Sequence, residues 1–322
     1  MSNITNFPNG ISSMGVPLPS TGIPVTYGRY IFVDADNGND GNDGRTLGTA
    51  VKTIAQAYSL ATTNANDVIL LSANAAHTLT SMLDVSKSRV HFVGLGVGPR
   101  KYGQRAKINM GVTTAVTDLF MVKNTGVGNS FTNIKFASDN TLTQAIGTVG
   151  EGGEYASYSN CEFYNSVKLD SDTHAELVLN GDSAQFYNCT FGSLADSVSG
   201  NKIRPAVTFT TNTVTATSQA RDVLFDGCKF WKNAGGTGTV MVKISSDNDI
   251  ERVAEFHDCQ FVANKLGSVP AVAIASATLS KAQVILTGDT CAFNCTKIAT
   301  ATGVVSGLSV KVATATIGVQ AS

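Results

Sequence analysis

Two stretches, 28 residues apart, decide the fold of this chain: Tyr158-Ser-Asn-Cys161-Glu-Phe163 and Phe186-Tyr-Asn-Cys189-Thr-Phe191. Each runs from an aromatic residue through a turn residue to a small apolar residue and a phenylalanine. The cysteine and the last phenylalanine are two positions apart, so on a strand they face the same side, and the polar residue between them faces the other. The pattern predicts a strand with one buried face and one solvated face.

The pattern recurs at uneven intervals through most of the chain. Further copies lie at 131–136, 225–230 and 256–261, and a partial copy lies at 288–293. Successive cysteines from Cys161 to Cys291 are 28, 39, 31 and 32 residues apart, which suits coils joined by loops of variable length. Between 64 and 322 no helical spacing of apolar residues lasts three turns. The sequence therefore predicts an all-β solenoid, a parallel β-helix of about nine coils of about 30 residues each over 29–300.

Equivalent positions of such a solenoid stack on one another at about 4.8 Å. Stacking predicts two interior columns, one of cysteine and one of phenylalanine. Their members are Cys161, Cys189, Cys228, Cys259 and Cys291, and Phe163, Phe191, Phe230, Phe261 and Phe293. Stacked thiols point in parallel, which is poor geometry for a disulfide, so we expect free buried thiols.

Composition narrows the classes of function. The 322 residues carry 23 Lys and Arg against 24 Asp and Glu, a net charge of -1, and only 15% are charged, against roughly 25% in an ordinary domain. A near-neutral chain does not work by neutralising phosphates, and no apolar run reaches the ~18 residues of a membrane span. We expect no nucleic-acid and no membrane partner. The N-terminus has no signal-peptide pattern, which predicts synthesis and assembly in a host cytoplasm.

The first 28 residues differ in kind from the rest. They contain no charged side chain and four of the seven prolines, and their apolar residues follow no strand or helix period. Such a segment favours an extended arm that lies on another protein, and the alternative is an arm folded back along its own β-helix. The candidate anchoring residues are Ile4, Phe7, Pro8, Ile11, Met14, Val16, Leu18 and Ile23.

The two ends of the solenoid need covering, because an open stack exposes unpaired strand edges. An amphipathic helix near 50–62, with Ile54, Tyr58 and Ala61 on one face and Thr49 as its N-cap, is predicted to plug the first coil. Residues 301–322 are almost uncharged and are predicted to add one or two closing strands.

The entry segment carries a resemblance to a known family. Val33-Asp-x-x-x-Gly-x-Asp40, then Gly44, then Lys52-Thr-Ile-x-x-Ala57, resembles the entry motif of pectate-lyase-like right-handed β-helix proteins, with Ala50-Val51 where the motif usually has a proline. This family is common among secreted polysaccharide-active enzymes and tailed-phage virion proteins. The stretch 6–17 is also similar to the opening of small β-helix proteins encoded with phage head genes. The resemblance implies a right-handed coil, and it implies fold more strongly than activity.

The residue patterns that could support catalysis are incomplete in this sequence. Lyases of the resembled family use clustered Asp to hold Ca²⁺ and an Arg base in Arg-x-Pro-x-x-Arg, and Arg204-Pro205 lacks the second Arg. The acidic groups at 34–43, 170–172 and 247–251 lie in loop-like contexts, where turn capping is the simpler interpretation. The four histidines have no metal-site spacing, and the cysteines lie in apolar positions. We therefore expect no catalytic residue, no cofactor and no metal site.

These observations lead to a hypothesis for function. The resemblance, taken together with the missing catalytic pattern, leads us to expect a non-enzymatic virion protein of a tailed phage, a capsid decoration or head-fibre protein on the outer surface of the capsid. Its partners would be the major capsid protein, contacted through the arm, and two further copies in a homotrimer. The alternative is a tailspike-type protein that binds or depolymerises a host-surface glycan. A secreted lyase is a third possibility, disfavoured by the missing signal peptide.

Overall fold

The computed structural model describes most of the chain. The described residues are 26–96, 105–110, 119–138, 146–165, 174–197, 202–216, 218–234, 236–264 and 269–299, together with four short strands at 12–13, 16–17, 304–306 and 311–313. None of the helices in these ranges is both long and apolar enough to cross a membrane.

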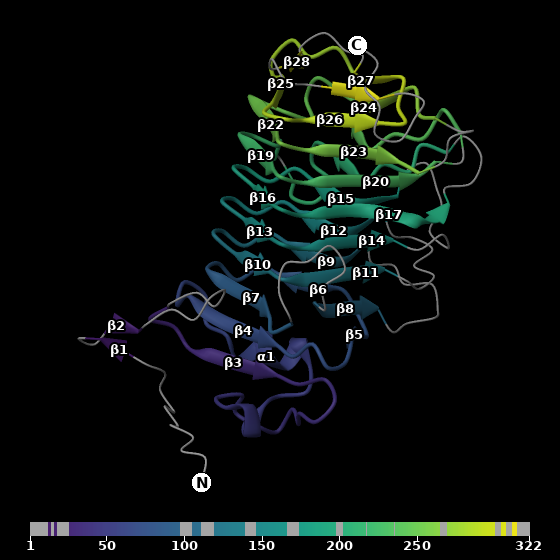
Figure 1. The fold of residues 1–322 in the computed structure, drawn as a ribbon. Helices are drawn as coiled ribbons and strands as arrows, with labels where there is room; N and C mark the ends of the chain where they lie inside the picture. The colour runs from purple at the N-terminus through teal and green to yellow at the C-terminus, as the bar shows by residue number, and fades with distance from the viewer. Residues whose placement is uncertain are drawn as a thin grey trace.

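Three parallel sheets run the length of the molecule (Figure 1). Sheet 1 contains β3 (Tyr30–Val33), β4 (Asp67–Leu71), β7 (Val90–Gly94), β10 (Ser130–Thr132), β13 (Ser157–Ser159), β16 (Gln185–Tyr187), β19 (Val223–Asp226), β22 (Val253–His257), β25 (Gln283–Thr287) and β28 (Val304–Ser306). Sheet 2 contains β5 (His77–Leu79), β8 (Ala106–Met110), β11 (Ile134–Ser138), β14 (Glu162–Asn165), β17 (Thr190–Ser197), β20 (Lys229–Asn233), β23 (Gln260–Ala263), β26 (Cys291–Phe293) and β29 (Lys311–Ala313). Sheet 3 contains β6 (Leu83–Val85), β9 (Phe120–Asn124), β12 (Gly147–Glu151), β15 (Ala175–Leu179), β18 (Val207–Phe209), β21 (Val242–Ile244), β24 (Val272–Ser276) and β27 (Lys297–Ala299).

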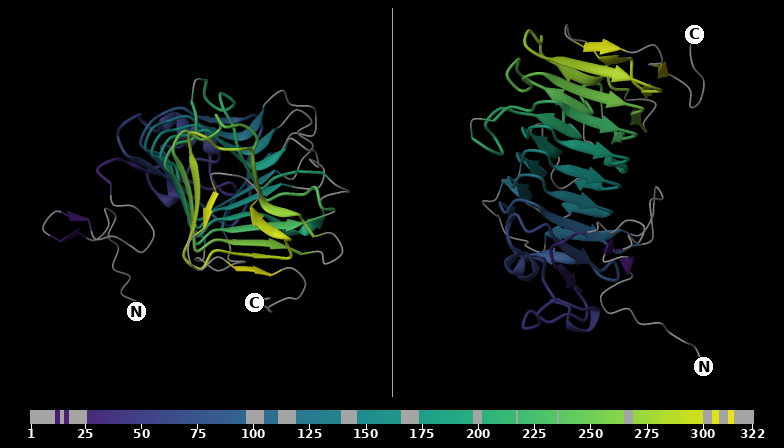
Figure 2. Two further views of the ribbon diagram at one scale, coloured as in Figure 1. Left: turned by 90° about the horizontal axis from the view of Figure 1, so that it is seen from above. Right: turned by 90° about the vertical axis from the view of Figure 1, so that its left-hand side faces the viewer.

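From β4 onward the chain visits the three sheets in rotation, so each strand pairs with the strand three places along the chain. The first strand, β3, pairs with β4, which follows it directly in the same sheet. Seen from above in Figure 2, the coils lie over one another around a shared interior. Among the described residues, eight successive coils pass through all three sheets, and partial coils stand at both ends. The predicted all-β right-handed parallel β-helix is confirmed, with about one coil fewer than expected.

The corner between sheets 1 and 2 explains why the copies stay in register. The residue before the small apolar position has a left-handed backbone in every complete copy, with φ of 54° at Asn160, 51° at Asn188, 63° at Gly227 and 49° at Asp258. Asn, Asp and Gly are the residues that tolerate this conformation. The Asn160 side chain also donates to Asn133 Oδ1 one coil below at 3.0 Å. Each corner thus turns at the same point, and the backbone N–H of its left-handed residue donates to a carbonyl of the next coil.

The N-terminal edge of sheet 1 is covered by the entry segment. Phe32 N donates to Gly44 O, and Val51 N donates to Phe32 O, so β3 is hydrogen-bonded on its outer side. A short 3-10 helix, η1 (Leu47–Thr49), precedes the α-helix α1 (Ile54–Leu60). The Asp40 carboxylate accepts from Lys52 N and Thr53 N and so holds the start of α1.

The expected N-cap of this helix is corrected by the structure. Thr49 ends η1, and the N-cap of α1 is Thr53, whose side chain accepts from Gln56 N at 3.1 Å. The helix cannot begin earlier because Val51 is extended and bridges Val33 of β3. Ile54 and Ala57 are buried in the interior of the first coil, as the plug requires.

The two termini are described only in part. In the arm, β1 (Ser12–Ser13) and β2 (Val16–Pro17) form an antiparallel pair. Ile4, Phe7, Pro8, Ile11, Met14, Leu18 and Ile23 lie outside the described residues, and of Val16 only the backbone is described. At the other end, β28 pairs with β25 and β29 pairs with β26, and the rest of 301–322 lies outside the described residues.

Candidate functional site

The interior contains aromatic columns rather than a cavity. Phe163, Phe191, Phe230 and Phe261 are paired in register along sheet 2, and their ring centroids are 4.7, 5.1 and 4.7 Å apart. A second column on sheet 1 contains Phe131, Tyr158, Phe186, Phe225 and Phe256, with centroids 4.7–5.0 Å apart. Stacked, fully buried rings at this spacing fill the interior of these coils with packed side chains.

The cysteines lie between the two aromatic columns. Cys161, Cys189, Cys228 and Cys259 are free and fully buried. Each thiol lies close to the backbone carbonyl of the aromatic residue one coil below: Cys161 Sγ donates to Phe131 O at 3.4 Å, and Cys228 Sγ donates to Phe186 O at 3.3 Å. Burial raises the pKa of the Cys161, Cys189 and Cys228 thiols well above the usual value. A thiol held neutral in this way is a poor nucleophile.

The last predicted members of both columns are corrected by the structure. Cys291 pairs with Gln260, and Ala292 pairs with Phe261, so Phe293 is out of step by one residue and half-buried. The corner here is one residue longer, with Gly288 in the left-handed region at φ 64°. Thr290 takes the position above Cys259 and accepts a hydrogen bond from its backbone N–H at 3.2 Å.

One carboxyl group lies deep in the interior. Glu151, at the end of β12, is fully buried and accepts hydrogen bonds from Tyr158 Oη, from Asn124 Nδ2 at 2.8 Å and from Gly153 N at 2.6 Å. Desolvation by burial raises the pKa of Glu151 to about 7, against the lowering effect of these donors. No pattern in the sequence points to this group, because Glu151 ends a strand of small residues and Gly152 and Gly153 follow it.

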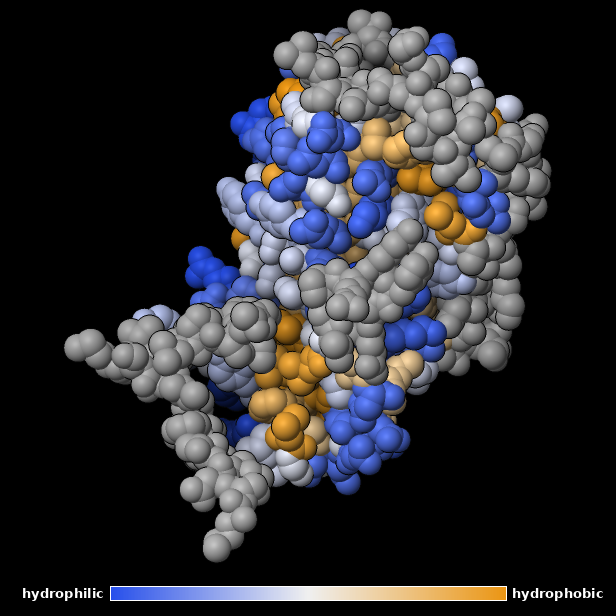
Figure 3. Space-filling view, viewed as in Figure 1, coloured by the Kyte–Doolittle hydropathy of each residue, from blue (hydrophilic) through white to orange (hydrophobic). Residues whose placement is uncertain are grey.

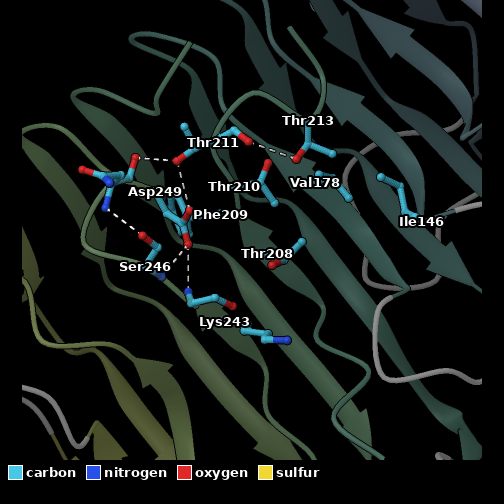
Figure 4. Close-up of a pocket in the computed structure, with 12 residues that line it drawn as sticks. Ile146, Val178, Thr208, Phe209, Thr210, Thr211, Thr213, Lys243, Ser246 and Asp249 are labelled. Carbon is cyan, nitrogen blue, oxygen red and sulfur yellow. Dashed lines mark hydrogen bonds between the residues drawn. The ribbon is translucent and has the colours of Figure 1, made fainter. Parts of the chain in front are cut away.

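A shallow groove crosses the outer face of sheet 3 (Figure 4). It has a volume of about 460 Å³; half of its lining residues carry hydroxyl groups, and the others include the apolar Ile146, Val178 and Phe209, one lysine and one carboxylate. Its polar lining includes Thr208, Thr210, Thr211, Thr213, Lys243, Ser245, Ser246, Asn248 and Asp249. The signal for it is the run Thr208-Phe-Thr-Thr-x-Thr, which the sequence analysis passed over.

The carboxylate of this groove is engaged in holding a loop. Asp249 Oδ2 accepts from Ser245 N at 2.8 Å and from Ser246 N at 2.9 Å, and its other oxygen accepts from Thr211 Oγ1 at 3.2 Å. Glycoside hydrolysis needs two carboxyl groups facing one another across the scissile bond. Among the described residues that line the groove, Asp249 is the one acid, so the groove can donate and accept hydrogen bonds but lacks an acid–base pair.

The outer face of sheet 1 changes character along its length. At the N-terminal end, Val68, Leu70 and Val93 face outward yet are buried, and Tyr30 and Phe32 pack against them. In the same outward column, later coils carry Thr132, Ser159, Tyr187, Asp226, His257 and Thr287. Figure 3 shows apolar surface at the end of the molecule that holds β3 and β4. The apolar cluster of Tyr30, Phe32, Val68, Leu70 and Val93 is called the outer cluster below.

The single tryptophan offers no platform on the surface. Trp231 lies on the far side of the sheet from Phe230, and its side chain is 8% exposed within one chain. Sugar-binding surfaces present aromatic faces to solvent, and burial withdraws this one.

Comparison with known proteins adds to this geometry. No family model and no curated protein matches the sequence. Among solved structures, pectate lyase Pel9A is 14% identical with a TM-score of 0.58, over 82% of this chain and 63% of the lyase. Pectin methylesterase PemA from Erwinia chrysanthemi is 14% identical with a TM-score of 0.51, over 86% and 81% of the two chains. ORF18 of Geobacillus virus E2 is 13% identical with a TM-score of 0.50, over 83% of this chain and 53% of the viral one.

These similarities are similarities of backbone fold and not of amino-acid sequence. The chain spans less than two thirds of the lyase and about half of the viral protein. At identities near 14%, with enzymes and a viral protein among the matches, the similarity establishes the pectate-lyase-like β-helix fold and leaves activity open.

Proposed function

We propose that this chain is a structural protein of a tailed-phage virion, a decoration or head-fibre protein fixed to the outside of the capsid by its N-terminal arm. Its partner is the major capsid protein, it assembles in the host cytoplasm, and it packs as a homotrimer. The proposal is supported by the resemblance of the entry motif and arm to phage β-helix proteins and by a fold shared with a viral protein.

The observation that carries the proposal is the position of the outer cluster. It occupies the coils nearest to the point where the arm joins the body, since Thr26 and Gly28 contact Asn66 immediately before β4. Val68, Leu70 and Val93 are already buried within one chain, so the half-buried rings of Tyr30 and Phe32 are the part of the cluster that can contact a partner. Apolar side chains that stay partly exposed on a polar outer face support a contact surface there. The arm and the outer cluster together make the N-terminal end of the rod the end that attaches to the capsid. The rest of the rod, whose outer face is polar, projects away from the capsid.

The test separates attachment from folding. A chain lacking residues 1–25 keeps Thr26 and the whole described body, so its circular dichroism and melting temperature should match those of the full chain. Particles are recovered after induction of a strain that carries the gene, stripped of the native protein, and mixed with either form. We expect co-sedimentation of the full chain and none of the shortened one. Equal attachment of both forms would refute anchoring by the arm.

A second candidate, a tailspike-type glycan-binding protein, is favoured by the hydroxyl-lined groove on sheet 3. Here the protein is incubated with purified capsular polysaccharide of the host, and both retention on the polysaccharide and release of reducing or unsaturated ends are measured. Cleavage products would overturn the non-enzymatic proposal. Retention without products, abolished by Thr211→Val and Lys243→Ala together, would assign glycan binding to the groove.

A further inference from the structure

Three metal-ligating side chains converge on the outer side of sheet 1, far along the rod from the outer cluster. Asp226 ends β19 and His257 ends β22, and the two are direct partners in the parallel register. Asp258 follows at the corner. One ligand atom from each of the three lies within 4.8 Å of the other two, and His257 Nε2 is 3.4 Å from Asp258 Oδ2. All three side chains are partly or fully accessible to solvent.

The hydrogen bonds of the next coil fix which imidazole nitrogen carries the proton. Thr287 Oγ1 is 2.9 Å from Glu255 Oε1, and because a carboxylate only accepts, the threonine hydroxyl must donate its one hydrogen there. The same oxygen is 3.0 Å from His257 Nδ1 and can only accept from it. Nδ1 of neutral His257 therefore carries the hydrogen, and the unprotonated Nε2 lies 3.4 Å from Asp258 Oδ2.

This arrangement resembles the one found around metal-bound histidines, with a threonine hydroxyl inserted before the carboxylate. Such a histidine nearly always donates its remote N–H to a carboxylate, a carbonyl or a water, which orients the ring and makes the ligating nitrogen more basic. Here the remote N–H reaches the Glu255 carboxylate through the Thr287 hydroxyl. The unprotonated Nε2 of His257 and the carboxylate oxygens of Asp226 and Asp258 repel one another through their lone pairs. A cation bound between them would remove this repulsion.

The two carboxylates are also prepared for a ligand. Asp258 Oδ1 accepts from Asp289 N at 2.6 Å, which leaves Oδ2 directed at His257. Gly288, in the left-handed region, makes room for this carboxylate: a Cβ there would lie 2.0 Å from Asp258 Oδ1. Within the part of the chain that the structure describes, no donor is within hydrogen-bond distance of the Asp226 carboxylate.

We propose that Asp226, His257 and Asp258 form a binding site for a first-row divalent cation, best fitted by Zn²⁺. Zinc binds imidazole nitrogen and carboxylate oxygen at about 2.0–2.2 Å in a tetrahedron, which places its ligands about 3.3 Å apart. The separation between His257 and Asp258 already has this value, and Asp226 closes by rotating its side chain. Calcium takes six to eight oxygen ligands, so one imidazole with two carboxylates disfavours it. Three protein ligands leave a fourth position for water.

Titration calorimetry on the full chain tests the site. The protein is treated with EDTA, exchanged into chelator-free buffer and titrated with ZnCl₂, and we expect one site per chain. His257→Gln and Asp226→Asn should each weaken Zn²⁺ binding at least tenfold. The matched control is His91→Gln: His91 is also outward on sheet 1, but its ring nitrogens face Ser130 and Asn66 and no carboxylate. Cys291→Ser controls for the half-exposed thiol.

A further variant tests the relay. Thr287→Val keeps the shape of the side chain and removes the hydroxyl, and we expect about 10- to 100-fold weaker binding with an unchanged melting temperature in EDTA. Absence of Zn²⁺ binding by the wild type, full binding by His257→Gln, or tighter binding of Ca²⁺ than of Zn²⁺ would each overturn the proposal. The result is independent of attachment to capsids.

Discussion

Phe163, Phe191 and Phe230 occupy one position in three successive coils, and each ring is packed between two others. The aromatic and cysteine columns beside them make every coil a copy of its neighbour in side-chain shape. A cavity made in one coil cannot be filled by its neighbours without breaking their own stacking.

Truncation of two phenylalanines that look equivalent in sequence should give different results. Phe230→Ala removes a fully buried ring between Phe191 and Phe261 and should lower the free energy of unfolding by about 3–5 kcal/mol. Phe293→Ala removes a half-buried ring outside the column and should cost about 1 kcal/mol or less. Guanidinium unfolding of both variants measures the difference. Equal losses of unfolding free energy in the two variants would mean that a ring inside the column contributes no more to stability than a ring outside it.

The spacing in sequence was enough to predict which side chains of the complete copies face inward. The prediction from spacing failed at Phe293. It used the distance from the cysteine to the phenylalanine, whereas the register in sheet 2 depends on how many residues separate each strand from the preceding strand in sheet 1. Leu286 pairs with Phe256, and the chain then needs one extra residue at Thr287–Asp289 to reach sheet 2. The missing leading aromatic in that copy was the signal of this slip.

Glu151 should make stability depend on pH in an unusual direction. Its pKa is raised from 4.5 to about 7 by burial, so the folded state binds the proton more tightly than the unfolded state. The stabilisation is complete below pH 4.5 and is lost as the pH rises through 7, a change of about 3 kcal/mol. Glu151→Gln should therefore gain about 3 kcal/mol relative to wild type between pH 4.5 and pH 8. Unfolding curves at both values check this, and a constant difference would contradict it.

The capping helix α1 is short, and much of its stability comes from the following coil. Lys87 Nζ donates to three carbonyls at its C-terminal end, Tyr58 O at 2.6 Å, Ser59 O at 3.2 Å and Ala61 O at 2.7 Å. The last carbonyls of a helix have no intrahelical partners, and a lysine at the C-terminus also complements the helix dipole.

Replacing this lysine should loosen the cap. We expect Lys87→Met to lower the free energy of unfolding by about 1–2 kcal/mol and to increase hydrogen exchange of the α1 amides. The matched control is Lys52→Met, because Lys52 is exposed just before α1 and makes no ion pair among the described residues. If the two variants are equally stable, the lysine contacts contribute nothing to the cap.

The sequence predicted that a helix plugs the first coil but placed its start too early. Periodicity of apolar residues locates a helix face, whereas its first residue is decided by competition for backbone hydrogen bonds. Val51 is drawn into covering β3, and Asp40 holds the next two amides. The groove on sheet 3 and the site of Asp226 and His257 were missed for a related reason: both join residues from different coils, which one repeat cannot reveal.

The molecule as a whole is a rod with unlike ends. At the N-terminal end β3 is hydrogen-bonded by the entry segment, which protects it from pairing with another sheet. Only 15% of residues are charged, a low fraction that favours lateral packing of such rods. A rod of this shape can attach to a capsid by its N-terminal end and pack against other copies of the chain along its sides.

Lateral packing predicts the mass in solution. A homotrimer of 33.5 kDa chains would have a mass of about 100 kDa, from three times 33.5. Size-exclusion chromatography with light scattering measures it, at several loading concentrations. A mass of 33.5 kDa at all of them would refute the trimer, and the chain lacking residues 1–25 shows whether the arm contributes to association.

The column of free thiols places one buried cysteine in each central coil, and the labelling rate of that cysteine reports how fast its coil opens. Cys161, Cys189 and Cys228 are sealed from solvent and held in the unreactive protonated form, so a thiol reagent can modify each one only after its coil has opened. The order in which they are labelled in mild denaturant, read by mass spectrometry of peptides, therefore reports the direction in which the rod unzips.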